Sequence, residues 1–212
     1  MLKCPLCSCE ESTLYCKDET GEYRLCNDCT LVYVLEDEHL DEEAEKARYD
    51  LHKNSSDDEG YRKHLSKVSI PVLERIDQDA KGLDFGSGPG PTLSLLFEEA
   101  GHEMKIYDHF YAKDEAVLNS SYDFITSTEV VEHLYKPSEV LDSLWEIVNK
   151  GGLLCLLTQP YVNQDAFEKW YYKKDPTHVC FFSLETMQWL ASKWLAELEV
   201  VSKDIFIFKK LV

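Results

Sequence analysis

Four cysteines near the start of the chain have the spacing of a metal site. Cys4 and Cys7 form one Cys-x-x-Cys pair, and Cys26 and Cys29 form a second pair after eighteen intervening residues. This pattern is typical of a zinc ion held by four thiolates, because each pair makes a turn that presents two sulfurs to one tetrahedral ion. A closed shell of four sulfurs leaves no position for water, so we expect structural zinc and no catalysis there.

The remaining four cysteines carry weaker signals. Cys9 and Cys16 lie close enough in the sequence to replace one of the four ligands. Cys155 and Cys180 fall in apolar surroundings, where a buried and inert thiol is expected. A redox-active Cys-x-x-Cys is the alternative for one pair, but it leaves the other pair unexplained.

A glycine-rich loop at residues 83–90, LDFGSGPG, carries the second chemical signal. Alternating glycines between a strand and a helix allow a tight turn and let a ligand approach the backbone at the start of the helix. The last small residue of a dinucleotide-binding G-x-G-x-x-G/A pattern would fall at Pro91, which breaks that pattern. Asp84 disfavours a pyrophosphate and suits a cationic ligand, while Asp108, at the end of the next strand, suits ribose hydroxyls.

At this point the sequence resembles the class I S-adenosylmethionine-dependent methyltransferases, and within them the broad methyltransferase 23 group. The resemblance covers roughly residues 80–210. It rests on five ordered motifs: LDFGSGPG, KIYD, YDFITSTEVVEHL, NKGGLLCLLTQP and DPTHVCFFSLET. Family members often carry an amino-terminal zinc ribbon, so both halves of the chain fit one interpretation. One departure is that only fourteen residues separate Asp108 from Asp123, so we expect the usual third strand to be short or absent, and the acid that commonly meets the adenine has no clear counterpart.

The resemblance implies S-adenosylmethionine as the cofactor and assigns its contacts to the glycine loop, the KIYD segment and the fourth-strand motif. Tyr61 joins them as part of a lid that also contains Tyr49 and His52. The expected cofactor-binding residues are Asp84, Gly86, Ser87, Gly88, Gly90, Asp108, His109, Thr128, Glu129 and Tyr61.

Methyl transfer from a sulfonium is an in-line displacement, in which alignment and exclusion of water supply most of the catalysis. A base is needed only when the accepting atom carries a proton at neutral pH. The candidate catalytic residues are His133, His178 and Glu129, with Asp175 behind them. Structural roles stay open for each: a helix residue for His133, an orienting residue for His178 and a residue bordering the cofactor for Glu129.

Aromatic side chains cluster around the His178 segment. They form either a wall or cap of the acceptor site or ordinary core packing. These residues are Trp170, Tyr171, Tyr172, Phe181 and Phe182.

Short apolar runs alternate with helical patterns from about residue 80 onward, which predicts an α/β fold with a doubly wound, Rossmann-like methyltransferase sheet. The expected strands are 82–85, 103–107, 122–126 and 153–158, with a closing antiparallel hairpin of 197–201 and 204–208. The expected helices are 92–100, 138–149 and 184–196.

The chain divides into three predicted regions, of which the last forms this sheet. We expect a small β zinc ribbon at 1–35, an acidic helical linker or lid at 36–79, and the S-adenosylmethionine-binding Rossmann-like domain at 80–212. Residues 36–59 hold eleven acidic side chains against three basic ones, a pattern typical of a solvated face without chemistry. An amphipathic pattern then predicts a helix over 61–76 that is interrupted near Pro71.

The strongly acidic composition argues against two classes of binding partner, nucleic acids and anionic membranes. The chain has 212 residues, with 22 Lys plus Arg and 40 Asp plus Glu, for a formal charge of −18. Nucleic acid requires a cationic face that is not visible here, and the same charge argues against anionic membranes. The start, MLKCPLCSCEE, lacks a secretory pattern and no window resembles a membrane span, so we expect a cytoplasmic location; the oligomeric state stays open.

The expected function is methyl transfer to oxygen or nitrogen of a small-molecule or protein acceptor. The segment Ser127–Val130 has neither the Asn/Asp-Pro-Pro-aromatic signature of base-amino methylation nor a Pro-Cys nucleophile. One alternative is a non-catalytic module that binds the cofactor and docks a partner through the zinc ribbon. Another is a nicotinamide oxidoreductase, which Pro91 and Asp84 disfavour. The ribbon itself can cover the active site, contact a substrate protein or mediate dimerisation.

Overall fold

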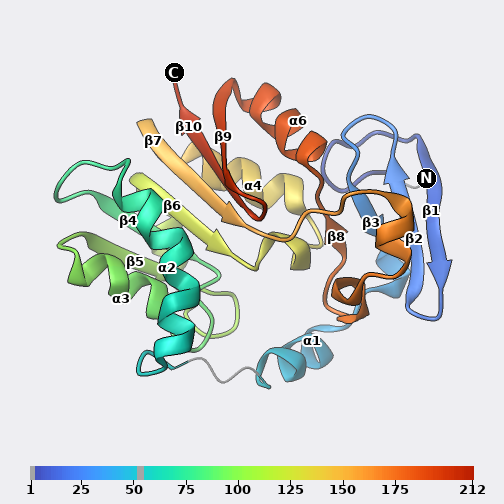
Figure 1. The fold of residues 1–212 in the computed structure, drawn as a ribbon, viewed down its shortest axis with the longest axis horizontal. Coiled ribbons are helices and arrows are strands. Elements are labelled where there is room, and N and C mark those ends of the chain that lie inside the picture. Colours follow the sequence, from blue (N-terminus) through green and yellow to red (C-terminus); the bar gives the residue numbers. More distant parts are fainter. Residues whose placement is uncertain (1–2, 52–54) are drawn as a thin grey trace.

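A computed structural model of the chain describes residues 3–51 and 55–212, so His52 of the expected lid lies outside the described residues. The described residues form two sheets, a six-stranded one with the order β5-β4-β6-β7-β10-β9 and a four-stranded one with the order β1-β2-β3-β8 (Figure 1). The fold is therefore an α/β methyltransferase-like mixed sheet with a small amino-terminal β module, as the sequence predicts.

The large sheet contains the four expected parallel strands and the closing hairpin. Its strands are β4 (Lys81–Phe85), β5 (Glu103–Tyr107), β6 (Tyr122–Thr128), β7 (Val148–Leu157), β9 (Ala196–Ser202) and β10 (Ile205–Lys210). β10 runs antiparallel to both β7 and β9. Between β5 and β6 the chain forms only a short 3-10 helix, η2 (Glu115–Asn119), so the usual third strand is absent from this described stretch and β5 is the sheet edge.

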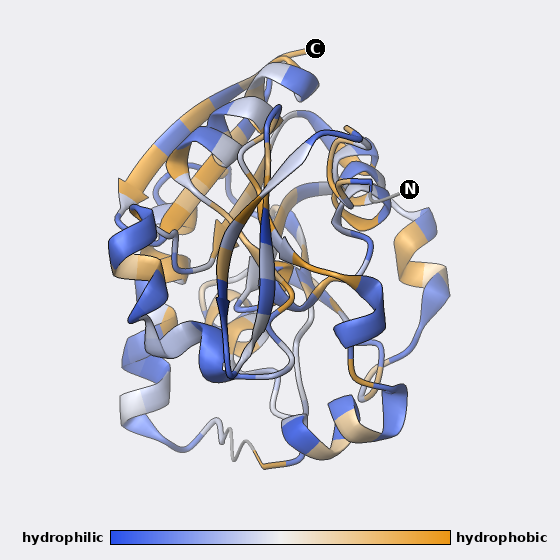
Figure 2. Ribbon diagram, turned by 90° about the vertical axis from the view of Figure 1, so that its right-hand side faces the viewer, coloured by the Kyte–Doolittle hydropathy of each residue, from blue (hydrophilic) through white to orange (hydrophobic). Residues whose placement is uncertain are grey.

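Helices cover both faces of the large sheet. They are α2 (Glu59–Leu73), α3 (Thr92–Glu99), α4 (Pro137–Glu146) and α6 (Leu184–Trp194). Successive residues of a strand point to opposite faces, so Leu153 and Cys155 of β7 pack with α2 and α3, whereas Leu154 and Leu156 pack with α4 and α6. In Figure 2 the helices alternate hydrophobic and hydrophilic residues, and the strands nearest the viewer are largely hydrophilic.

Two predicted helix ends and one predicted interruption differ from the structure. The helix expected to reach residue 149 ends at Glu146, because the chain from Val148 already pairs with β6. The helix expected to reach residue 196 ends at Trp194, where Leu195 turns left-handed with φ 51°. Pro71 does not interrupt α2, because it lies in the last turn, where its missing N–H removes only one bond before the helix ends.

The amino-terminal module contains a hairpin of β1 (Ser12–Asp18) and β2 (Gly21–Cys26), joined by a turn at Glu19 and Thr20. β3 (Val32–Val34) then pairs antiparallel with β8 (Cys180–Phe181), a strand from the far end of the sequence. The small sheet therefore shares a strand with the carboxyl-terminal half, and that strand begins two residues after His178.

The acidic stretch contains the 3-10 helix η1 (Glu36–Glu38) and the helix α1 (Glu42–Tyr49), which lies below the gap between the two sheets in Figure 1. Further short elements are η3 (Val131–His133), α5 (Gln164–Glu168) and η4 (Tyr171–Lys174). No helix among the described residues combines the length and apolar character needed to cross a membrane.

Candidate active site

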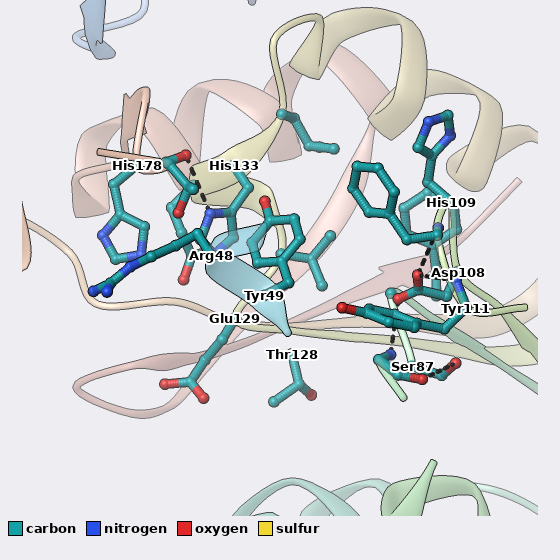
Figure 3. Close-up of a pocket in the computed structure, with 18 of the residues that line it drawn as sticks. Arg48, Tyr49, Ser87, Asp108, His109, Tyr111, Thr128, Glu129, His133 and His178 are labelled. Carbon is teal, nitrogen blue, oxygen red and sulfur yellow. Dashed lines mark hydrogen bonds between the residues drawn. The ribbon is translucent and has the colours of Figure 1, made fainter. Parts of the chain in front are cut away.

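A cavity of about 810 Å³ opens at the carboxyl ends of β4, β5 and β6. The glycine loop forms one side of it, and α1, η3 and the His178 segment form the other (Figure 3). This edge of an open α/β sheet is where ligands bind in such folds. The cavity therefore brings together most of the residues that the sequence singled out.

The glycine loop is held in place by Asp108. Its Oδ2 accepts a hydrogen bond from the Gly88 amide at 2.8 Å, and its Oδ1 accepts from the amides of Phe110 and Tyr111 at 2.9 and 3.0 Å. Gly86 has φ +78°, and a Cβ there would lie 2.2 Å from Val130 Cγ2. The positive φ and the closeness of Val130 explain why glycine is needed at residue 86.

The other loop residues differ in their exposure to the cavity. Gly86, Ser87 and Gly88 line it, whereas Gly90 is not among the lining residues, and its carbonyl instead accepts from the Thr92 amide at the start of α3. Asp84 is only 3% exposed and accepts a hydrogen bond from Thr126 Oγ1 at 2.9 Å. Burial raises the pKa of Asp84 to about 7, so a cationic ligand in the cavity would stabilise its ionised form.

The end of β6 supplies Thr128 and Glu129 to the same cavity. Thr128 Oγ1 is buried with no hydrogen-bond partner in the described chain. Glu129 has φ +55°, a conformation that non-glycine residues adopt rarely and that is concentrated at functional sites. Its Oε2 lies 3.6 Å from Nε2 of His64, and this contact lowers the pKa of Glu129.

Two further residues of the expected cofactor set, Tyr61 and His109, line the cavity. Tyr61 projects from α2, and burial raises its pKa to about 12. His109 also lines the cavity but is half exposed, with Nε2 3.5 Å from Glu42 Oε1.

The two candidate histidines lie side by side on the opposite wall, with ring centroids 4.6 Å apart. Nδ1 of His133 is 3.1 Å from the Thr177 carbonyl oxygen, and Nδ1 of His178 is 2.7 Å from the Tyr172 carbonyl oxygen. Burial lowers the pKa of His178, which favours its neutral form. Since a carbonyl only accepts, each ring carries a hydrogen on Nδ1, and the neutral ring of His178 keeps its lone pair on Nε2.

Glu132 joins this pair and was missed by the sequence analysis. It is 1% exposed, and one of its oxygens accepts a hydrogen bond from the Tyr172 hydroxyl. Burial raises its pKa. The nearest sequence signal is an acid directly before the candidate His133, but nothing in the pattern says that this acid is buried.

Helix α1 also contributes to the cavity, although its acidic sequence indicated only a solvated face. Arg48 donates from Nε and Nη2 to Oδ2 of Asp175, at 3.2 and 3.0 Å. Tyr49 packs edge-on against His133 with ring centroids 5.3 Å apart, and its hydroxyl donates to Glu45 Oε1 at 2.7 Å. Tertiary packing thus turns one face of α1 toward the cavity, where Tyr49 of the expected lid lies, while the acidic run gave no signal for Arg48.

The aromatic cluster divides between the two predicted roles. Tyr171 and Tyr172 line the cavity. Phe181 and Phe182 are fully buried in the core, and Trp170 packs at its edge.

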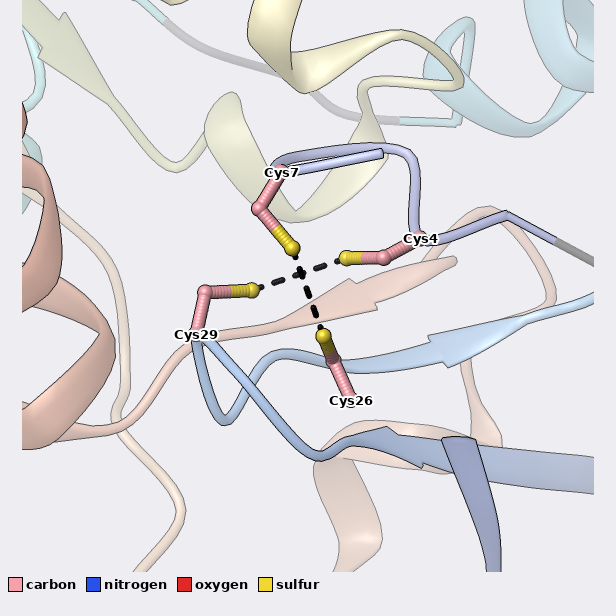
Figure 4. Close-up of side chains that lie close together, drawn as sticks. All are labelled: Cys4, Cys7, Cys26 and Cys29. Atoms are coloured by element: carbon pink, nitrogen blue, oxygen red, sulfur yellow. Dashed lines mark hydrogen bonds between the residues drawn. The ribbon is translucent and has the colours of Figure 1, made fainter. Parts of the chain in front are cut away.

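The four paired cysteines converge, as their spacing predicts. Their sulfurs lie within 4.8 Å of one another, with Cys4 Sγ 3.5 Å from Cys29 Sγ and Cys7 Sγ 3.3 Å from Cys26 Sγ (Figure 4). A hydrogen bond with the Cys29 thiol lowers the pKa of Cys4 to about 6. This four-cysteine cluster is consistent with a zinc ribbon.

The remaining cysteines lie outside this cluster. Cys9 contacts the Glu11 carbonyl, and Cys16 lies 3.8 Å from Nζ of Lys173. Cys155 and Cys180 are buried, as expected, and burial raises the pKa of both.

A family model described as a methyltransferase domain matches residues 56–203, well over half of the chain. The chain belongs to this methyltransferase family. The match spans the helix α2, the glycine loop, the carboxyl end of β6 and the two histidines, so the whole cavity wall outside α1 lies within it. Membership also removes the nicotinamide oxidoreductase alternative.

Individual relatives of this methyltransferase are distant. The ubiquinone biosynthesis O-methyltransferase of Ruegeria sp. (strain TM1040) is 28% identical over 81 residues, which is 38% of this chain and 32% of that protein. The chain thus matches about a third of the length of this curated relative.

Two solved structures share the fold. They are magnesium protoporphyrin IX methyltransferase from Synechocystis PCC 6803 with bound SAH (TM-score 0.55, 13% identity, 71% of this chain and 84% of that chain) and with bound SAM (TM-score 0.53, 14% identity, 71% and 80%). At these identities the likeness shows the class I methyltransferase fold.

Proposed function

We propose that this methyltransferase domain transfers a methyl group from S-adenosylmethionine to an oxygen or nitrogen atom of a small-molecule or protein acceptor. One observation carries the proposal: a single cavity places the glycine loop with Asp108 on one wall and the pair of His133 and His178 on the other. A site of this kind holds a donor at one end and an acceptor at the other, which is what an in-line displacement needs.

The cofactor half fits S-adenosylmethionine by its donor and acceptor groups. Asp108 keeps acceptor capacity for ribose hydroxyls, since each carboxylate oxygen accepts more than one bond. Asp84 offers negative charge to the ammonium end, and the unpartnered Thr128 Oγ1 lies on the wall between the two halves. Gly86, Ser87, Gly88, Tyr61, His109 and Glu129 complete the proposed contacts, with Gly90 shaping the loop. When bound, this cofactor supplies an electrophilic methyl group on a positively charged sulfur.

The acceptor half is proposed to orient the nucleophile and remove its proton. His178 presents Nε2 as an acceptor, because the Tyr172 carbonyl holds its Nδ1 hydrogen, and His133 lies beside it with Nδ1 bound to the Thr177 carbonyl. Glu129, held by His64 and placed at the end of β6, borders the two halves. Tyr49 and Arg48 of α1 cover the same wall and exclude water from it.

The cysteine cluster is proposed to hold one structural Zn²⁺. A tetrahedral ion with Zn–S bonds of about 2.3 Å needs sulfurs about 3.8 Å apart, close to the separations of the four thiols. Four sulfurs close the shell, so the ion adds stability and takes no part in the reaction. Four reduced thiols fit the proposed cytoplasmic location. The proposed domains are a ribbon (1–35), a linker or lid (36–79) and a catalytic domain (80–212).

Calorimetry with S-adenosylmethionine, S-adenosylhomocysteine and NADH tests the cofactor assignment. We expect micromolar binding of the two adenosyl compounds and none of NADH, with loss of binding in Asp108→Asn. Asp114→Asn is the matched control, because Asp114 caps the nearby η2 outside the cavity. Absence of adenosyl binding to the wild type would refute the proposal.

Transfer of label from S-adenosylmethionine to acceptors in a cell extract tests turnover. We expect labelled product with the wild type. Cofactor binding without any transfer would favour the alternative of a non-catalytic module that docks a partner through the ribbon.

A further inference from the structure

Three side chains lie together on the cavity wall opposite the glycine loop, and we call them the Glu132 cluster: Glu132, His133 and His178. A carboxylate oxygen of Glu132 and one ring nitrogen from each histidine all lie within 4.8 Å of one another. Two residues come from η3 and the third from the segment before β8. The Val179 amide donates a hydrogen bond to the Glu132 carbonyl, at 2.9 Å, and joins the two segments.

The two imidazoles are oriented as metal-binding histidines are. Ligating histidines almost always donate their other ring N–H to a carbonyl or carboxylate, which fixes the ring and its tautomer. Here the carbonyls of Thr177 and Tyr172 receive the Nδ1 hydrogens, at 3.1 and 2.7 Å. Nδ1 of each ring is therefore engaged as a donor, so Nε2 is the ring nitrogen that would coordinate a cation.

Glu132 supplies an independent observation. Its carboxyl group is 1% exposed, and the Tyr172 hydroxyl binds only one of its oxygens. The other oxygen, Oε2, is buried without a hydrogen-bond partner in the described chain, although Glu132 lines the cavity. A buried carboxylate with an unsatisfied oxygen is costly unless a cation compensates it.

We propose that the Glu132 cluster binds one divalent first-row transition-metal cation, which coordinates a hydroxyl group of the methyl acceptor. Two imidazoles and one carboxylate on one side of an ion form a facial set, and this set suits Mn²⁺, Fe²⁺, Co²⁺ or Zn²⁺ while leaving positions open toward the cavity. The site is separate from the cysteine cluster, whose four thiolates favour a softer, closed tetrahedral site.

The role of this cation rests on the proposed function and sharpens it to oxygen as the accepting atom. It also changes one part of that function, because His133 and His178 then hold the cation and do not act as bases. A hydroxyl bound to the ion loses its proton to water more easily, as metal-bound water does. The resulting oxyanion attacks the methyl carbon, so an O–C bond forms as the C–S bond breaks. The electron pair of that bond stays on sulfur, which changes from a sulfonium to a neutral thioether.

The experiment titrates Mn²⁺ into the zinc-loaded protein and follows free Mn²⁺ by electron paramagnetic resonance. We expect one ion bound per chain, and affinity at least tenfold lower in Glu132→Gln and in His178→Asn. Glu98→Gln controls for general attraction to a chain of charge −18, because Glu98 is an exposed acid on α3. Unchanged binding of S-adenosylhomocysteine shows that each variant is folded.

Co²⁺ gives a second readout in the same protein. Bands of a nitrogen and oxygen site, without the sulfur charge-transfer band of the cysteine cluster, support the proposal. A wild type that binds neither ion, or a Glu132→Gln variant that binds as the wild type does, overturns it.

Labelled methyl transfer with and without Mn²⁺ separates the two proposals. Transfer without metal binding refutes the cation site and leaves the proposed function intact. Metal binding without transfer to any hydroxyl acceptor supports the site and refutes the role given to it.

Discussion

Replacing Gly86 by alanine tests whether the glycine loop and the end of β6 must fit together as the structure shows. Gly86 has φ +78°, and its missing Cβ leaves room for the side chain of Val130. Val130 directly follows Glu129, so a displacement of Val130 would also move Glu129, which lines the cavity. Gly101 is a matched control, because it has φ +96° but a Cβ at that position would have nothing within 4 Å.

Two costs add at Gly86 and only one at Gly101. A left-handed conformation costs an alanine about 1–2 kcal/mol at either position. At Gly86 the new Cβ would also lie 2.2 Å from Val130 Cγ2 and 3.0 Å from Cγ1. Carbon atoms in contact lie about 3.5–4.0 Å apart, and overpacking of this kind costs about 1–3 kcal/mol more. We therefore expect Gly86→Ala to lose about 2–5 kcal/mol of unfolding free energy, and Gly101→Ala about 1–2.

Urea unfolding measures these losses, and calorimetry with S-adenosylhomocysteine measures the effect on the cavity. We expect Gly86→Ala to weaken binding at least tenfold and Gly101→Ala to leave it unchanged. Adding Val130→Ala should restore part of both losses, because it removes the two closest atoms and leaves only Cβ, at 3.2 Å. Equal costs at the two glycines, or strict additivity in the double variant, would refute the steric argument.

Three further predictions concern other parts of the molecule. Burial raises the pKa of Asp84 from 3.8 to about 7, so the unfolded chain loses this proton first and the free energy of unfolding should fall as pH rises from about 4 to 7. Asp84→Asn should remove up to roughly 4 kcal/mol of that fall. If urea unfolding gave the wild type and the variant the same pH dependence, this prediction would be contradicted. The Val179 carbonyl accepts from the Val34 amide of β3, and the Val179 amide donates to the Glu132 carbonyl. Cys26→Ser should therefore speed exchange of the Val34 and Val179 amide hydrogens, while Ile106 in β5 and the Cys9→Ser control stay unchanged; unaltered rates at both amides would show that the ribbon does not stabilise the segment that holds Glu132. The Lys173 side chain is 2% exposed and pairs with Asp18. Asp18→Asn should therefore destabilise the fold by about 1–3 kcal/mol in thermal unfolding, because it leaves a buried ammonium unpaired. The double variant with Lys173→Met should recover part of this loss, and no recovery would show that the unpaired ammonium is not its cause.

Local patterns in the sequence determined several features of this protein. The spacing of Cys4, Cys7, Cys26 and Cys29 predicted their convergence, because short turns and a hairpin suffice to bring the two pairs together. Alternating apolar runs predicted the strands of the large sheet, and the short interval after Asp108 predicted the missing third strand. Each of these depends on neighbours in the chain, which is what a sequence pattern records.

Helix boundaries depend partly on contacts outside the helix. Residues 147–149 have an acceptable helical pattern, but Ile147 accepts a hydrogen bond from the Tyr122 amide and Val148 pairs across to β6. Strand pairing therefore decided where α4 ends.

Only the tertiary structure showed that Glu132 and Arg48 also belong to the site. Glu132 reads as one more acid in an acidic chain, and Arg48 as one of a few bases in an acidic run. Packing buries the first between the Tyr172 and Val179 segments and turns the second toward Asp175. The pairing of β3 with β8 likewise joins residues nearly 150 positions apart. Such contacts depend on the free energy of long-range packing, to which the spacing of residues along the chain gives no guide.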